Sequence, residues 1–170
     1  MKTIIKIAVC VLVLSISFKP VEAQKSAKDK KEAKAALIKK LIDTKNFVFT
    51  ANSMMPMRGM TRELTSTFDL RVSPDTIISY LPYFGRAYVA PIDPMQGALD
   101  FTSTQFNYTT TPRKKGGWDI LIATKDQRDN KRMTLTVFDN GTASLAVTSN
   151  NDQPISFEGY VSERRSRKKK

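Results

Sequence analysis

The stretch MTLTVFDNGTASLAV, which spans residues 133–147, decides the fold of this chain. Apolar residues occupy alternate positions on both sides of Asp139-Asn140-Gly141, as expected of two strands that each have one buried face. Asn-Gly between two such runs is among the strongest short signals for a β-hairpin. The stretch therefore predicts two antiparallel strands joined by a tight turn.

The same two-residue period recurs on both sides of this hairpin. The runs that carry it are Phe47 and Phe49; Phe68, Leu70 and Val72; Ile77 to Leu81; Leu99 and Phe101; Phe106 and Tyr108; Trp118, Ile120 and Ile122; and Ile155, Phe157 and Val161. No helical pattern separates them, whereas parallel strands need crossovers of a dozen or more residues. We therefore predict a mainly β (α+β) fold in which an antiparallel meander of about eight strands forms a barrel-like sheet or a sandwich.

One helix is expected before the strands. Ser26, with Asp29 three residues later, resembles a capping box, so the helix is predicted to begin there. It should end near Lys45 or Asn46, where a residue that tolerates left-handed geometry follows favourable cations. Its apolar stripe consists of Ala33, Leu37, Ile38, Leu41 and Ile42. This pattern predicts an N-terminal helix packed on the sheet, and the alternative is a lid over one end of a cavity.

Residues 1–23 have the pattern of a signal peptide. A basic start precedes an apolar run over residues 7–18, and small residues lead to a predicted cut after Ala23. The run is shorter than the ~20 residues that span a bilayer, and no transmembrane segment is expected in the mature chain. We therefore predict a periplasmic or secreted protein, with a single helix-plus-antiparallel-β domain over residues 24–162 and a basic, disordered tail over residues 163–170.

Several catalytic chemistries are closed to the mature chain. Cys10 is the only cysteine and lies in the predicted signal peptide, and the sequence contains no histidine. Cys/His zinc sites, Ser-His-Asp triads and cysteine nucleophiles are therefore excluded. Carboxylates remain as acid–base candidates, but the pattern predicts them at turns and outward-facing positions. We expect no enzymatic activity, no metal site and no cofactor.

The net charge of +12 is concentrated at the two ends of the chain. Residues 41–162 carry twelve basic and twelve acidic side chains, so the expected domain is neutral. Nucleic-acid binding usually requires a basic patch on the fold itself, and no nucleic-acid partner is expected. The tail from Arg164 to Lys170 is either a solvated end or a weak tether to an anionic envelope surface.

The densest group of special residues is YLPYFGRAY, residues 80–88. Pro82 lacks an N–H group and Gly85 allows a close turn, so one interpretation is a rigid corner where a strand leaves the sheet. The alternative is the mouth of a pocket with apolar walls and a few polar tips. The candidate ligand-binding residues are Tyr83, Arg86, Tyr88 and Trp118.

A second cluster, MMPMRGM, spans residues 54–60 and holds four of the seven methionines. Methionine fills irregular gaps under loops and also faces apolar partners. Thioethers can also bind Cu(I), but neither histidine nor cysteine completes such a site here. The cluster predicts a packing or contact segment.

The nonapeptide at residues 80–88 resembles the hallmark of a family of exported proteins from Bacteroides-type bacteria, the domain of unknown function four-two-five-one. Further resembling pieces are Phe47-Val48-Phe49, Gly116-Gly117-Trp118, Asn140-Gly141 and Ile155-Ser156-Phe157-Glu158-Gly159. The resemblance implies export, one domain and no assigned activity, and it carries no catalytic residue.

Two functions are therefore expected to compete. The first is an exported, non-enzymatic binding module for a small apolar or amphipathic ligand, held near the four candidate residues. The alternative is an envelope protein that contacts another protein or a surface and has no small-molecule ligand. A cavity near Tyr88 would favour the first function, and a filled interior with an exposed apolar patch would favour the second.

Overall fold

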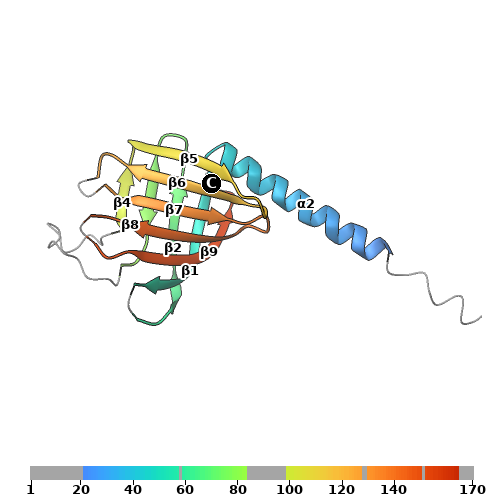
Figure 1. The fold of residues 1–170 in the computed structure, drawn as a ribbon, viewed down its shortest axis with the longest axis horizontal. Coiled ribbons are helices and arrows are strands. Elements are labelled where there is room, and N and C mark those ends of the chain that lie inside the picture. Colours follow the sequence, from blue (N-terminus) through green and yellow to red (C-terminus); the bar gives the residue numbers. More distant parts are fainter. Residues whose placement is uncertain (1–20, 58, 84–98, 128–129, 151, 165–170) are drawn as a thin grey trace, which may run out of the picture. The chain divides into compact units, whose positions relative to one another are not determined.

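The computed structural model describes residues 21–57, 59–83, 99–127, 130–150 and 152–164. In this part of the chain one helix precedes nine strands (Figure 1). The elements are α2 (Val21–Asp43), β1 (Phe47–Pro56), β2 (Arg62–Val72), β3 (Ile77–Tyr80), β4 (Asp100–Ser103), β5 (Phe106–Pro112), β6 (Trp118–Thr124), β7 (Arg132–Val137), β8 (Thr142–Thr148) and β9 (Ile155–Ser162). No helix among the described residues is long and apolar enough to cross a membrane.

The nine strands form one antiparallel sheet in the order β4-β3-β2-β1-β9-β8-β7-β6-β5. Each strand pairs with its neighbour in sequence except at one junction, where β9 pairs with β1 instead of β5 with β4. In Figure 1, β5 to β8 run across the view, and β1 and β2 cross behind them at a steep angle. The sheet therefore curls into a nearly closed barrel, and the predicted antiparallel β fold with one N-terminal helix is confirmed.

The interior is filled by the alternating apolar residues of both layers. The largest fully buried side chains are Phe47, Phe49, Phe157, Ile42, Met54, Leu70, Ile77, Leu99, Ile120, Ile122, Met133 and Leu135. Most of them come from the runs that the two-residue period identified. At ~25 cal/mol per Å² of apolar surface, this burial is the main favourable contribution to folding.

The helix differs from its predicted bounds at both ends. It begins at Val21 and ends at Asp43. The left-handed residue that ends it is Lys45, with φ of 50°, and not Asn46. The N–H groups of Lys45 and Asn46 donate to the carbonyls of Ile42 and Leu41 at 3.1 Å, which satisfies acceptors that the last helical turn leaves open.

The last turns of the helix dock on the barrel through Ile38, Leu41 and Ile42, all of which are buried. The Tyr108 hydroxyl of β5 donates a hydrogen bond of 3.2 Å to the Ile42 carbonyl. Burial, with a smaller contribution from the charge of Asp43, raises the pKa of Tyr108. The phenol therefore stays neutral and serves as a donor that joins helix and sheet, as expected of a docked helix.

A bulge and a glycine shape the pairing of β1 with β9. The register of β1 shifts between Ala51 and Ser53, and Ala51 lies opposite Gly159. A Cβ atom on Gly159 would overlap the Thr50 carbonyl oxygen and would lie 2.9 Å from the Thr50 carbonyl carbon. The two backbones can approach this closely only because residue 159 has no side chain.

The corner between β4 and β5 is held by Asp126 from the loop after β6. Its carboxylate accepts the Thr104 N–H at 2.7 Å and the Gln105 N–H at 3.1 Å, and it also accepts the hydroxyl of the buried Ser103. Gln127 of the same loop donates its amide to the Thr102 carbonyl at 2.8 Å. This loop therefore connects the two strands where the sheet has no ladder between them.

Asp126→Asn is expected to lower the melting temperature at neutral pH and to have little effect in acid. The Ser103 hydroxyl, followed by the two backbone N–H groups, lowers the pKa of Asp126 to about 2. Because the folded pKa lies below the unfolded value, the stabilisation is present above about pH 4 and is lost as the pH falls toward 2. Thermal unfolding of both proteins between pH 7 and pH 3 checks this result, and a difference independent of pH would contradict it.

Candidate functional site

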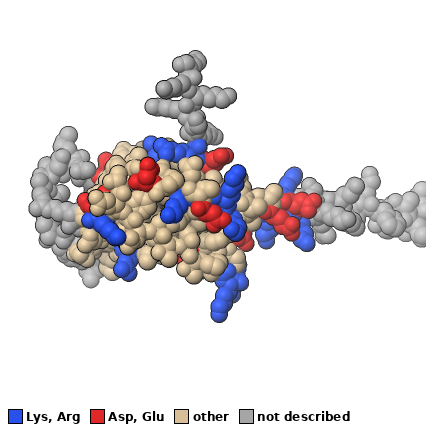
Figure 2. All heavy atoms as spheres, turned by 90° about the horizontal axis from the view of Figure 1, so that it is seen from above, with Lys and Arg blue, Asp and Glu red and all other residues tan. Residues whose placement is uncertain are grey.

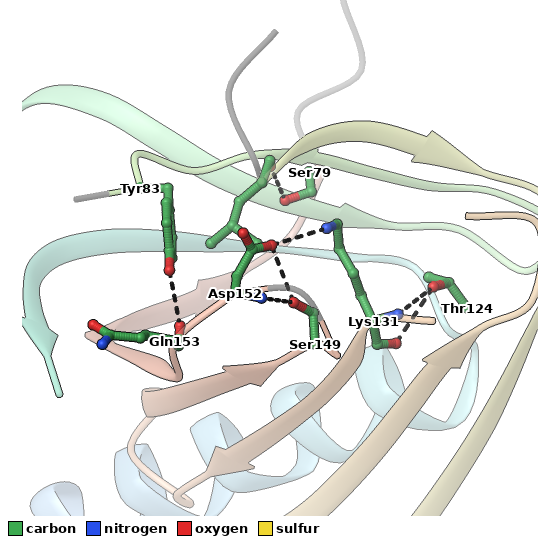
Figure 3. Close-up of polar contacts among 8 residues, drawn as sticks. Ser79, Tyr83, Thr124, Lys131, Ser149, Asp152 and Gln153 are labelled. Atoms are coloured by element: carbon green, nitrogen blue, oxygen red, sulfur yellow. Dashed lines mark hydrogen bonds and ion pairs between the residues drawn. The ribbon is translucent and has the colours of Figure 1, made fainter. Parts of the chain in front are cut away.

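A buried ion pair occupies the end of the barrel where β6 ends and β7 begins. Lys131 and Asp152 are only 5% and 9% exposed, and the Lys131 Nζ atom lies 3.8 Å from the Asp152 Oδ2 atom (Figure 3). The lysine also lies over the Phe101 ring of β4, with Nζ 5.7 Å from the ring centroid. The lysine and the aspartate are therefore buried together where the two layers of the sheet meet, beside the Phe101 ring.

The backbone around both charges is fixed by short-range hydrogen bonds. The Lys131 N–H donates to the Thr124 hydroxyl and the Thr124 N–H donates to the Lys131 carbonyl, each at 3.0 Å. On the other side, the Ser149 hydroxyl donates to Asp152 Oδ2 at 3.0 Å and accepts the Asp152 N–H at 3.0 Å. These hydrogen bonds close the connection between β6 and β7 and the turn before β9. We therefore assign the Lys131–Asp152 pair a structural role at this end of the barrel.

A polar pocket adjoins the pair. It has a volume of about 400 Å³ and is lined by Asn130, Arg132, Thr148, Ser149 and Asn150. Ser149 belongs both to the pocket and to the turn that holds Asp152. All five lining residues are polar, one is cationic and none is acidic. The pocket can offer several hydrogen-bond donors to a small molecule.

Two of the four candidate ligand-binding residues are described, and they lie far apart. Tyr83 is half-buried at the polar end, and its hydroxyl donates to the Gln153 carbonyl at 3.2 Å (Figure 3). Trp118 begins β6, whose seven residues end at Thr124 beside Lys131, so Trp118 lies ~20 Å from Thr124 at the opposite end of that strand. The structure therefore does not bring Tyr83 and Trp118 together. Arg86 and Tyr88 lie outside the described residues.

Trp118 instead belongs to the end of the barrel that carries the helix. It pairs with Pro112 and Val137, and its half-buried side chain packs against the core. The preceding Gly117 has φ of 88°, and its N–H donates to Asp139 Oδ1 at 2.9 Å. The Gly-Gly-Trp segment thus forms a turn that packs beside the β7–β8 hairpin.

The methionine-rich segment forms the connection between β1 and β2, which projects beyond the rest of the sheet (Figure 1). Met54 is 1% exposed and points into the core, whereas Met55, Met57 and Met60 are 52%, 63% and 85% exposed. Register pairs from Met54 to Phe157 and from Pro56 to Ile155 anchor its base to β9. We call residues 54–63 the methionine hairpin. It presents thioethers to solvent on a fixed support.

The ion pair was missed in the sequence, although it left a signal. Lys131 precedes Met133, Leu135 and Val137 at the same two-residue spacing, so the strand period places its side chain on the same inner face as theirs. A lysine in phase with a buried run requires an acidic or polar partner. The position of that partner, Asp152 in the turn before β9, depends on the pairing of β7, β8 and β9.

Charged side chains elsewhere do not gather by sign on the face seen in Figure 2. In the described part of that face, lysine and arginine alternate with aspartate and glutamate. No group of three or more His, Cys, Asp or Glu side chains lies close enough to bind a metal ion among the described residues. The candidate features are therefore the polar pocket and the methionine hairpin.

These features define a class of small domain in which a nearly closed antiparallel barrel is capped at one end by a helix and polar at the other. A family model for a domain of unknown function, DUF4251, matches residues 29–161. The chain belongs to this DUF4251 family. A crystal structure of a DUF4251 family protein from Bacteroides eggerthii is similar, with 18% identity and a TM-score of 0.57, over 78% of this chain and 87% of that chain. A comparison with curated proteins finds no match.

Proposed function

We propose that this domain is a non-enzymatic interaction module of the bacterial cell envelope, and that it contacts a partner protein through the methionine hairpin. The observation that carries the proposal is the exposure of Met55, Met57 and Met60 on one projecting hairpin. Apolar side chains clustered on a surface mark interaction sites more often than single exposed ones do. Thioethers suit such a role because they are flexible and polarisable.

The anchoring of the hairpin supports this function. Met54 is buried, and β1 pairs with both β2 and β9 up to the base of the hairpin. A partner would therefore meet contact residues whose support is already ordered, which lowers the entropic cost of association. The leader pattern of residues 1–23 supports placement in the envelope.

The competing expectation, a small apolar ligand in a barrel mouth, has weaker support. The interior positions of the described strands are filled by large side chains such as Phe47, Phe49 and Phe157. Of the described candidate residues, Trp118 begins β6, whereas the Tyr83 hydroxyl bonds Gln153 beside the other end of that strand. The polar pocket of about 400 Å³ has walls that suit a polar ligand better than an apolar one. The apolar-ligand function stays a prediction.

Methionine oxidation tests the interaction. Purified protein and the envelope fraction of the producing cells are treated with hydrogen peroxide, and sulfoxide at each methionine is measured by peptide mass spectrometry. We expect Met57 and Met60 to oxidise several-fold more slowly in the envelope fraction, because a bound partner covers their sulfur atoms. Met54 is the internal control, since the core should protect it equally in both samples.

Equal oxidation rates for Met57 and Met60 in the two samples would contradict the proposal. A second readout uses Met→Gln at positions 55, 57 and 60 together, compared with Leu121→Gln. Leu121 is an exposed apolar residue on β6, so its replacement controls for the loss of apolar surface away from the hairpin. The triple variant should lose any complex resolved by size-exclusion chromatography of detergent extracts, and Leu121→Gln should retain it.

A further inference from the structure

We propose that the polar pocket binds a small organic molecule through an oxyanion group, a carboxylate, sulfate or phosphate, and that Arg132 is the residue that selects for the negative charge. This inference is independent of the methionine hairpin, because the hairpin does not contribute to the pocket. The carrying observation is a concave set of donors around one arginine, with no acid among the described lining residues.

Three of the five described lining residues have side-chain donors that the fold does not use. Among the described residues, the Arg132 guanidinium and the amides of Asn130 and Asn150 make no hydrogen bond or ion pair with another side chain or with the backbone. By contrast, the hydroxyl of Thr148 is used within the fold, since it donates to the Arg132 carbonyl at 3.3 Å. Unpaired donors gathered in a concavity are what a site for an acceptor-rich ligand requires.

Arginine sets the expected chemical class of the ligand. Its planar guanidinium presents paired N–H groups that match the two oxygens of a carboxylate, sulfate or phosphate. The nearby charges of Lys131 and Asp152 face each other, so among the described residues Arg132 is the lining side chain whose charge is not compensated by an ion pair. The volume of about 400 Å³ exceeds that of a bare ion, so there is room for an organic group beside the asparagines.

The pocket is built on a rigid support. Arg132 and Thr148 lie opposite each other in the ladder of β7 and β8. Ser149 is held by its two hydrogen bonds with Asp152, which in turn faces the buried Lys131. A ligand that binds here therefore does not have to order the two strands that carry Arg132 and Thr148.

Titrations of the purified protein with acetate and succinate, and with acetamide and succinamide as uncharged isosteres, test the proposal. Phosphate and sulfate are titrated in parallel, all at constant ionic strength, and side-chain amide and guanidinium signals are followed by NMR. We expect the signals of Asn130, Asn150 and Arg132 to shift with the anions and to respond at least ten-fold more weakly to the isosteres. The anion that binds most tightly identifies the oxyanion class.

Arg132→Gln should weaken anion binding at least ten-fold, and Arg132→Lys should give an intermediate loss because it keeps the charge but not the paired donors. Lys125→Gln is the matched control, since it removes one charge from the exposed loop after β6 without touching the pocket lining. Equal weakening by Arg132→Gln and Lys125→Gln would overturn the proposal, because it would indicate general electrostatic attraction. Binding to vesicles of anionic phospholipid without a response to the free anions would also overturn it.

Discussion

Gly159→Ala is expected to lower the free energy of unfolding by about 3 kcal/mol, more than a typical point substitution does. The new methyl group would occupy the space of the Thr50 carbonyl oxygen, with Ala51 Cα only 3.1 Å away. Both obstacles belong to the backbone of β1, so no rotation of a side chain can remove the overlap. The β1–β9 ladder would have to separate at the bulge, and this ladder joins the two halves of the sheet, β4 to β1 and β9 to β5.

Urea denaturation of the variant and of the parent protein measures this effect. Ser156→Ala, on the same strand, controls for the effect of a new alanine on strand propensity. Adding Thr50→Ala to the Gly159→Ala variant should not restore the free energy of unfolding, since the clash is with the carbonyl of residue 50 and not with its side chain. A loss below about 1 kcal/mol would mean that the two strands can move apart at little cost.

Asp152→Asn is expected to destabilise the protein by about 3 kcal/mol, because it removes the carboxylate that faces a lysine only 5% exposed. Two charges buried together compensate each other, whereas a buried charge that loses its counter-ion bears more of its desolvation penalty. The amide oxygen of asparagine can still accept from Ser149, so the turn before β9 should persist. The loss therefore reports on the charge and not on the local fold.

The double variant Lys131→Met, Asp152→Asn separates the effect of the buried charge from the effect of the local fold. A methionine of similar length can lie against Phe101 without a charge, and stability should return to within about 1 kcal/mol of the parent protein. Differential scanning calorimetry of the two single variants and the double variant gives the coupling energy between the positions. If the double variant is as unstable as the sum of its parts, the ion pair is not the source of the effect.

The sequence predicted the strands well because each strand has one face in the core. The hairpin at residues 133–147 formed as expected, with Leu135 opposite Leu145 and both fully buried. Local patterns could not show that β9 lies between β1 and β8, because that order depends on contacts between distant parts of the chain. The described part of the meander contains nine strands, in line with the predicted number of about eight, and the runs of Leu99 with Phe101 and of Phe106 with Tyr108 belong to the separate strands β4 and β5.

A candidate site is harder to derive from the sequence than the strands are, for a physical reason. Aromatic residues such as Tyr83 and Trp118 suggest a pocket by their chemistry, but the ends of the barrel they occupy are set by strand direction. The inward position of Lys131 could be recognised from its two-residue spacing to the buried residues of β7. That spacing does not show that Asp152 is its partner in the ion pair. The pocket around Arg132 depends on the register of β7 with β8, which no single segment encodes.

The position of β9 determines when this domain can become native during synthesis. It is the last of the described strands to be synthesised, yet it pairs with β1, the first of them, and with β8. Until residues 155–162 are available, no ladder can join β1 to β8, and pairing strands so distant in sequence is entropically slow. We therefore expect the β1–β9–β8 ladders to form late in folding, after the local hairpins on either side of them.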